Sequence, residues 1–369
     1  MERKLSAELP PIISKILDPG AAPISALLGF DACIDTIVRV VRERAGKEET
    51  GYFENGLEFG HYLAEKTDKS CGIELQTRLS KPGGNMTITG NALGCLDVKC
   101  ECIGTFGYPD ILPFFRALSP NCRLHTIADT ITATALEFSN NKVIMFDPGP
   151  YNNLRWTDIK ERVGISLLRE LFSNRQIIAL LNWSEIEHSS EIWRGIQSDI
   201  LPYMTSGRGE PLLFSDLSDC SRKGGNEIKE ALSLLGSFRR NCRVVLSLNQ
   251  NESEIVAKTF GISYGSDDEL FIRDLYRVSN SDIIVIHRIE EAVAFNGSEI
   301  VRCPTFLCKD PVVLTGGGDN FNAGFCFAAA LGSDLFSTLV VANGVVGFYV
   351  AEGRSPSRSD LAGFLKNHL

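Results

Sequence analysis

Short, continuous apolar runs recur along the chain and predict buried strands at 24–30, 99–104, 176–183, 211–217, 243–249 and 282–287. Runs of this kind, without polar alternation, are typical of parallel strands covered on both faces. Amphipathic segments between and after them predict helices at 85–96, 157–172, 190–201, 225–238, 267–278, from residue 319 onward and at 335–353. Strands alternating with helices of this length indicate βαβ units and a doubly wound α/β sheet.

Two segments interrupt the alternation. Residues 36–80 are charged and broken, and residues 123–150 contain strand-like runs with no helix between them, with Asn140-Asn141 as a hairpin turn. Both leave the early part of the predicted sheet, so a small β-rich lid over one end of the sheet accounts for both. We therefore expect a single domain over residues 1–369 with a lid inserted from approximately 36–80 and 123–150.

Composition narrows the class of protein. The net charge of -9 argues against a sequence-independent nucleic-acid binder, although backbone amides can still hold a phosphate. No stretch approaches about 18 uninterrupted apolar residues, and the first residues lack a signal-peptide core. The 11 cysteines are odd in number and scattered, which favours buried reduced thiols over a disulfide framework. We expect a soluble cytoplasmic protein with neither nucleic acid nor membrane as a partner.

The segment TGGGDNFNAGF at 315–325 carries the strongest chemical signal. Three glycines at a helix start expose N–H groups, which together with the helix dipole favour an anion. A carboxylate at Asp319 would compete with that anion unless the two act on different atoms. In phosphoryl transfer to an alcohol, amides hold the phosphoryl group while a carboxylate takes the hydroxyl proton. The alternative is an ordinary Gly-rich turn with Asp319 as the helix N-cap.

The segment LTGGGDNFNAGFCFAAALG at 314–332 resembles the C-terminal signature of the ribokinase/PfkB family of carbohydrate kinases, D-T-x-G-A-G-D-x-F. Val313 and Leu314 replace the leading Asp-Thr of the family. PGGNMTITGNALG from residue 82 resembles the family's Gly-Gly motif, and GFDACIDTIVRV at 29–40 lies where the family carries a sugar-binding aspartate. The resemblance covers the chain from about residue 24.

This resemblance implies a ribokinase-like three-layer α/β/α doubly wound sheet with a small β-rich lid. It also implies a carbohydrate kinase that transfers a phosphoryl group from a Mg-nucleotide to a sugar hydroxyl. Asp319 would be the general base, and the amides of Gly316, Gly317 and Gly318 would form the anion hole. Mg²⁺ would be the cofactor, and ATP would be the phosphoryl donor in preference to ADP.

The sugar side would contain Asp35, with Asp31 as its rival, together with Gly84 and Asn85. Either aspartate could instead cap a turn, and Asn85 could be the N-cap of the following helix. On the donor side the resemblance assigns nucleotide contacts to three residues, Thr315, Asn343 and His287. The alternatives are a structural histidine at a strand end for His287 and a packing polar residue on an apolar helix face for Asn343. His287 replaces a family threonine, and with GFDACID it resembles the ADP-dependent sugar kinases of the same superfamily.

The N-x-x-E motif of the family matches Asn251 and Glu254, which would order Mg²⁺ through water. Asn249 and Glu252 form a second N-x-x-E in overlapping register, and a helix cap explains such a pair equally well. Two other functions stay open: a sugar-binding sensor without activity, and a nucleoside kinase. The oligomeric state also stays open, since the lid edge could pair between subunits to form a homodimer or stay solvated.

Overall fold

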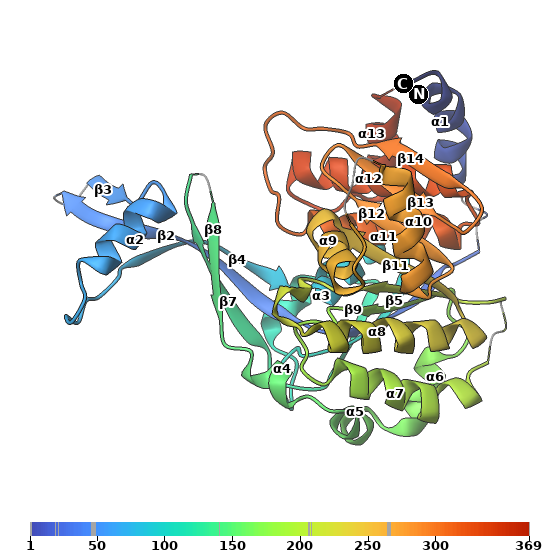
Figure 1. Ribbon diagram of the computed structural model, residues 1–369, viewed down its shortest axis with the longest axis horizontal. Helices are drawn as coiled ribbons and strands as arrows, with labels where there is room; N and C mark the ends of the chain where they lie inside the picture. Colours follow the sequence, from blue (N-terminus) through green and yellow to red (C-terminus); the bar gives the residue numbers. More distant parts are fainter. Residues whose placement is uncertain are drawn as a thin grey trace.

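The computed structural model describes residues 2–18, 20, 22–45, 49–139, 141–205, 207, 209–263 and 267–368. The larger of the two sheets in this part of the chain has nine strands in the order β14-β13-β12-β11-β10-β9-β1-β5-β6 (Figure 1). From β12 to β6 all neighbours are parallel, whereas β13 and β14 are added antiparallel at one edge. The strands are β1 (Ser25–Phe30), β5 (Lys99–Gly104), β6 (Cys122–Thr126), β9 (Ile177–Leu181), β10 (Leu212–Asp216), β11 (Arg243–Asn249), β12 (Ile283–His287), β13 (Glu291–Phe295) and β14 (Ile300–Pro304).

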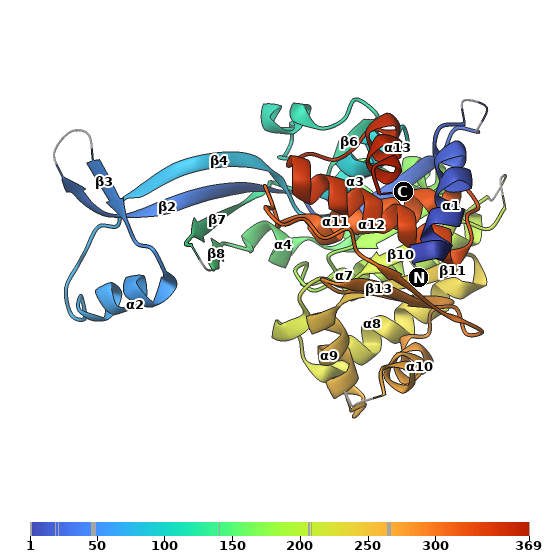
Figure 2. The ribbon, with the colours of Figure 1, turned by 90° about the horizontal axis from the view of Figure 1, so that it is seen from above.

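Helices cover both faces of this sheet, which gives three layers (Figure 2). One face carries α5 (Trp156–Val163), α6 (Ile165–Phe172), α7 (Ser189–Asp199), α8 (Gly225–Ser237), α9 (Gln250–Thr259) and α10 (Asp268–Ser279). The other carries α1 (Glu2–Ile16), α3 (Asn85–Cys95), α11 (Gly317–Ala330), α12 (Leu335–Glu352) and α13 (Arg358–Lys366). In β1, Leu27 lies in one core and Leu28 in the other, which explains why the strand is apolar throughout.

The six predicted strands are confirmed, and so is the α/β fold class. The predicted helix at 157–172 is instead two helices, because Gly164 adopts φ = 89° between α5 and α6. The sequence patterns did not predict the β13–β14 hairpin, α1 or α13. Short 3-10 helices complete the body at η1 (Pro113–Ala117), η2 (Leu201–Tyr203), η3 (Cys220–Arg222) and η4 (Phe238–Arg240).

Helix α12 is long and apolar enough, by length and composition, to cross a membrane, and it is the one such segment among the described residues. The expectation of no uninterrupted apolar run of about 18 residues still holds, because Ser337, Thr338 and Asn343 interrupt the apolar residues of α12. However, 72% of the helix is buried inside the protein, where it packs against α1, α11 and α13. Such burial is what a core helix of this length requires.

A second sheet extends away from the body and forms the lid (Figures 1 and 2). Its strands are β2 (Cys33–Ala45), β3 (Glu49–Tyr52), β4 (Leu75–Gly83), β7 (Ile131–Glu137) and β8 (Lys142–Phe146), in the order β3-β2-β7-β8 with β4 paired to β2. Helix α2 (Gly56–Ala64) lies against this sheet, and aromatic side chains give it a small core of its own: Phe53, Phe59, Tyr62 and Phe138. Helix α4 (Gly149–Asn153) follows β8.

The expected start of the second insertion needs correction. Residues 122–126 form β6, which pairs in parallel with β5 in the nine-stranded sheet. The reason is packing, because Cys122 and Leu124 lie against the core on the α3 side. Of the strands in the second insertion, only β7 and β8 belong to the lid, and they form the predicted antiparallel hairpin. Asn140, half of the predicted turn, lies outside the described residues.

Candidate active site

Polar residues gather where parallel strands end. Asp31 follows β1 directly, and Asp216, Asn249 and His287 are the last residues of β10, β11 and β12. Parallel strands place their carboxyl ends at one edge of the sheet. At this edge the strand order reverses around β1, which has β5 on one side and β9 on the other. Such a switch point is the usual place for a ligand in open α/β sheets.

The glycine segment forms the N-terminus of α11 at this edge. Gly316 is the N-cap with φ = 93°, and an added Cβ would lie 2.8 Å from Tyr349 Oη, so only glycine suits the position. The Gly317 amide donates to the Leu314 carbonyl at 3.1 Å. The amides of Gly316, Gly318 and Asp319 have no acceptor within the described part of the chain. Three N–H groups are therefore free for an anion, and Gly317 contributes to the turn instead.

Asp319 lies in the first turn of α11 and is half-buried. Its carboxylate has no hydrogen bond or ion pair with any described residue. Burial raises the pKa of Asp319 well above its usual range, and the negative charges of Asp216, Asp31 and Asp35 raise it further, while Lys81 opposes the shift. The structure thus holds an uncommitted carboxyl group beside free backbone amides.

Asp31 is fully buried, and both of its oxygens are already used. Oδ1 accepts from the Met86 amide at 2.9 Å, and Oδ2 accepts from Asn182 Nδ2 at 2.9 Å. Burial raises the pKa of Asp31 to about 6 despite these bonds. Gly84, like Gly316, must be glycine, since it adopts φ = 93° and an added Cβ would lie 2.6 Å from Asp31 Oδ2. Asp31 therefore anchors the start of α3.

Asp35 lies on β2 in the lid, and the only hydrogen bond to its side chain among the described residues comes from Cys33 Sγ at 3.4 Å. Its carboxylate is available to a ligand, whereas that of Asp31 is not. Asn85 is the first residue of α3, and Gly84 holds the N-cap position that was the alternative role of Asn85. Asn85 Oδ1 accepts from Ser218 Oγ at 3.4 Å.

A cavity of about 1100 Å³ adjoins the glycine segment, and its lining residues include none from the lid strands. Among the residues assigned beforehand, it is lined by Gly317, Gly318, His287, Asn343, Asn251 and Glu254, whereas Thr315 is not part of its wall. Exposed apolar side chains, Ile289, Leu307 and Leu314, form part of the wall. The cavity therefore combines apolar walls with the N-terminus of α11.

Two polar atoms in this cavity wall are buried without a partner in the described residues. They are His287 Nε2 and Asn343 Oδ1. Asn343 Nδ2 donates to the carbonyl oxygens of Cys303 and Pro304, so this side chain holds the end of β14. Burial lowers the pKa of His287, which keeps its imidazole neutral beside Phe321, 5.0 Å away between ring centroids.

The two registers of the N-x-x-E motif have different environments. Asn249 caps α9 and exchanges hydrogen bonds with Glu252, whose Oε2 accepts from the Asn249 amide at 2.9 Å. Glu252 is buried, and burial together with Asp216 raises its pKa to about 9. Asn251 and Glu254 are exposed on the outer cavity wall. Glu252, in the second register, therefore lies near Asp216, and these two residues form the acidic cluster of the site.

Sequence reasoning missed two groups at this site. Asp216 accepts from Asn322 Nδ2 at 2.6 Å and lies close enough to Asp319 to raise its pKa. An acidic residue at the end of a predicted parallel strand was the available signal. Lys81 and Lys142 reach the glycine segment from β4 and β8, with Nζ atoms 3.5 Å from Thr315 O and 3.4 Å from Thr315 Oγ1.

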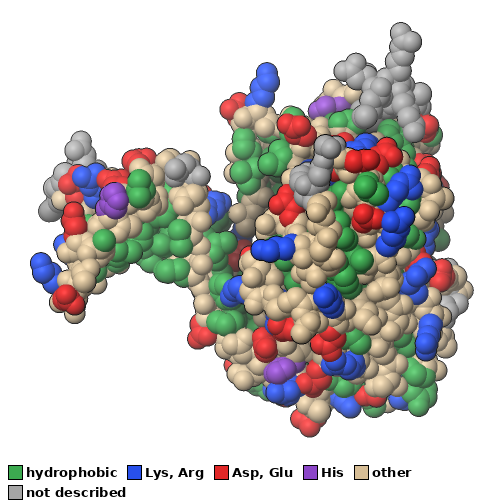
Figure 3. Space-filling view, in the orientation of Figure 1, with side chains coloured by type: hydrophobic (Ala, Val, Ile, Leu, Met, Phe, Trp, Pro, Cys, Tyr) green, Lys and Arg blue, Asp and Glu red, His purple; other side chains and the backbone are tan. Residues whose placement is uncertain are grey.

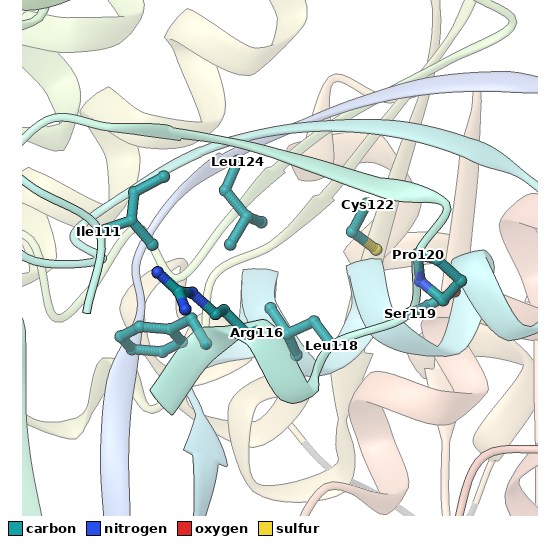
Figure 4. Close-up of a pocket in the computed structure, with 8 residues that line it drawn as sticks. Ile111, Arg116, Leu118, Ser119, Pro120, Cys122 and Leu124 are labelled. Atoms are coloured by element: carbon teal, nitrogen blue, oxygen red, sulfur yellow. The ribbon is translucent and has the colours of Figure 1, made fainter. Parts of the chain in front are cut away.

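A second cavity, of about 470 Å³, lies between η1 and β6 (Figure 4). It is lined by Ile111, Phe115, Arg116, Leu118, Ser119, Pro120, Cys122 and Leu124. None of the assigned site residues faces it, and its wall carries no carboxylate. The sheet edge where the parallel strands end, together with the larger cavity, is therefore the candidate active site.

Comparisons with known proteins show which family the sequence matches. A family model described as prokaryotic ketohexokinase matches residues 17–368. A ketohexokinase from Haloferax volcanii is 26% identical over 350 residues, which cover 93% of this chain and 91% of that protein.

Solved structures share the fold at low sequence identity. A ribokinase from Thermotoga maritima has a TM-score of 0.63 at 17% identity and covers 94% of this chain and 100% of its own. An Arabidopsis thaliana ribokinase complexed with ribose and ATP has a TM-score of 0.63 at 15% identity, with coverage of 94% and 99%. An adenosine kinase from Sinorhizobium meliloti has a TM-score of 0.63 at 14% identity, with coverage of 95% and 100%. These likenesses establish the ribokinase-like fold.

Proposed function

Since the chain belongs to the prokaryotic ketohexokinase family and is a sugar kinase, we propose that it transfers a phosphoryl group from a Mg-nucleotide to a hydroxyl of a ketohexose. One observation carries the proposal. Asp319, an uncommitted carboxyl group, stands beside the free amides of Gly316 and Gly318; Gly318 lines the large cavity, and the charge of the lid residue Asp35 reaches Asp319. This is the arrangement that deprotonates an alcohol while it stabilises charge on a phosphoryl group.

The nucleotide occupies the large cavity, and the sugar lies under the lid. Asp35 accepts hydrogen bonds from sugar hydroxyls, Asn85 lines the sugar side, and the His287 and Asn343 atoms without partners are available to the nucleotide. Asp319 takes the proton of the attacking sugar hydroxyl. The hydroxyl oxygen bonds to phosphorus while the bond between phosphorus and the leaving phosphate oxygen breaks. The free amides stabilise the charge on the transferred group. ATP is the preferred donor; ADP is the alternative.

The acidic cluster fits a magnesium ion. Burial raises the pKa of Glu252, and the nearby negative charge of Asp216 raises it further. A divalent cation would offset the repulsion between these two carboxylates. The described residues hold no group of three or more His, Cys, Asp or Glu placed to ligate a metal, and Mg²⁺ keeps several water ligands. We therefore propose the Asn249–Glu252 register, with Glu252 ordering the ion through water, in place of Asn251 and Glu254. The ion would neutralise charge on the nucleotide phosphates.

The test is the Asp319→Asn variant in an assay of nucleotide consumption with ketohexoses, D-fructose first, using ATP and ADP in parallel. A lost general base should lower kcat by about 10²–10⁴-fold while nucleotide binding persists. Asp97→Asn, at an exposed position outside the site, is the matched control. Near-wild-type kcat in Asp319→Asn would remove Asp319 as the base.

The wild-type protein separates the remaining readings in the same assay. Sugar binding without nucleotide consumption would identify a sensor, and turnover of adenosine with no active ketohexose would identify a nucleoside kinase.

We also propose that the whole chain is one domain and that the protein is cytoplasmic. Two residues separate the end of β1 from the first lid strand, and the lid contacts the start of α11 through Lys81, which supports a single unit. The 11 cysteines are all free, a pattern that suits a reducing compartment. Limited proteolysis and fractionation of cells test these two points.

A further inference from the structure

Lys81 brings a positive charge from the lid to the catalytic edge. On β4 it stands directly opposite Asp35 of β2 in the antiparallel register, so the two side chains lie on one face of the lid. Its ammonium reaches Thr315 O at 3.5 Å and Tyr349 Oη at 3.4 Å. Thr315 immediately precedes Gly316, whose amide is free. The lysine therefore lies beside both the sugar side and the anion hole.

The charge of Lys81 is not neutralised by a direct partner. Within the described ranges, no carboxylate lies within 4 Å of its ammonium. Burial lowers the pKa of Lys81, while Asp35 and Asp319 act in the opposite direction. A half-buried ammonium held by two contacts near 3.5 Å is only partly compensated for the water it has lost. An anion that binds with the substrate would give the Lys81 ammonium the hydrogen-bond and charge partner that it lacks.

Lys142 is a useful comparison because it approaches the same loop from β8. Its ammonium contacts Thr315 Oγ1 at 3.4 Å, but it also lies 3.7 Å from Glu137 Oε1. Lys142 is an exposed residue, whereas Lys81 is half-buried. Exposed charges gain little from a nearby opposite charge because water screens them. Of the two, Lys81 is the one positioned to act strongly on a bound anion.

We propose that Lys81 is a further catalytic residue, whose ammonium contacts the phosphoryl group as it passes from nucleotide to sugar. The inference rests on the proposed function. Lys81 keeps its proton throughout and forms no covalent bond. Its hydrogen bonds shift from Thr315 O and Tyr349 Oη to phosphoryl oxygens, where negative charge is spread during transfer. The amides of Gly318 and Asp319 act from the helix side and Lys81 from the lid side.

The position of Lys81 on the lid favours transfer to the sugar over transfer to water. The anion hole belongs to the body, but this cation belongs to the strand pair that also carries Asp35. A sugar that binds Asp35 thereby orders the strand pair that holds Lys81. Water at the position of the attacking hydroxyl makes no comparable contact with the lid. Charge stabilisation is therefore more complete for transfer to the sugar than for hydrolysis of the donor.

The experiment compares wild type with Lys81→Met, Lys81→Gln and Lys81→Arg, each checked for folding by its melting curve. Lys66→Met is the matched control, because Lys66 is a lid lysine whose ammonium lies over the Tyr62 ring. Loss of Lys81 should lower kcat by about 10²–10³-fold, the range for removing one charge-stabilising donor. KM for ketohexose and nucleotide should change only a few-fold, Lys81→Arg should recover part of kcat, and Lys66→Met should match wild type.

A second readout uses MgADP with aluminium fluoride and ketohexose, a mimic of the transferring phosphoryl group. Its affinity should fall in Lys81→Met by about the same factor as kcat, since both report contacts made at the transition state. Lys81→Gln keeps a donor for Thr315 O without the charge, and it answers the question should Lys81→Met not fold. Wild-type kcat in Lys81→Gln, or a raised sugar KM with unchanged kcat, would reduce Lys81 to a tether of the lid.

Failure of the two proposals can be told apart. Wild-type protein that turns over no ketohexose refutes the proposed function and this inference together. Wild-type turnover with unaffected Lys81 variants refutes only the role of Lys81.

Discussion

Replacing Asp31 by asparagine tests the electrostatics of the site through folding stability. Burial raises the pKa of this carboxyl group from 3.8 to about 6. One pKa unit corresponds to about 1.4 kcal/mol, so the shift of roughly two units is worth about 3 kcal/mol. Because the folded-state pKa is raised, the protonated form is favoured in the folded protein. The stabilising contribution is complete below pH 3.8, is lost as the pH rises toward about 6, and stays lost above it.

The side chain of the Asp31→Asn variant is neutral at every pH, so this loss should disappear. Hydrogen bonding is largely preserved, since the amide oxygen of the new side chain can still accept from the Met86 amide. The new amide nitrogen would face Asn182, whose Oδ1 has no partner among the described residues and can accept after the Asn182 amide rotates. The variant should therefore gain up to about 3 kcal/mol over wild type between pH 4 and pH 7, less any cost of the rearranged bonds.

Urea unfolding of both proteins at half-unit steps from pH 4 to pH 7.5 measures this difference. The other titrating groups are common to both chains, and Asp97→Asn, at an exposed position, controls for the loss of one surface charge. The expected signature is a difference in unfolding free energy that grows between pH 4 and pH 6 and is constant above. Parallel curves would refute the conclusion that Asp31 is held as a buried, energetically costly carboxylate.

Two further predictions concern the metal and the lid. In a Mg²⁺ titration, Glu252→Gln should raise the Mg²⁺ concentration for half-maximal activity by about 10-fold. Glu254→Gln, on the outer cavity wall, should leave that concentration unchanged. The reverse result would restore the Asn251–Glu254 register. We also propose a homodimer through the lid, where apolar side chains gather on the surface and Leu79, Ile144 and Met145 are 50%, 55% and 52% exposed (Figure 3). Ile144→Lys should then shift sedimentation toward the monomer, and a wild-type protein that is monomeric at high concentration would contradict the proposal.

Local patterns in the sequence were sufficient for the architecture. Apolar runs such as 24–30 and 243–249 report burial on both faces, which only a covered parallel sheet provides, so strands and fold class followed from them. The glycines before Asp319 likewise marked the start of α11, because a left-handed residue and exposed amides have local sequence requirements. The lid was located from its missing helices, though β6 was assigned to it wrongly.

Tertiary structure alone decided which of two neighbouring candidates has a free side chain. Asp31 and Asp35 are four residues apart, yet both carboxylate oxygens of the first are bonded to α3 and Asn182, while the second is half-buried on the lid and accepts one hydrogen bond. Glu252 and Glu254 differ in the same way, one buried near Asp216 and the other exposed. Lys81 lies 234 residues from Thr315 along the chain. Periodicity along a chain records which face of an element is buried, but burial against a particular distant group depends on how the elements pack together.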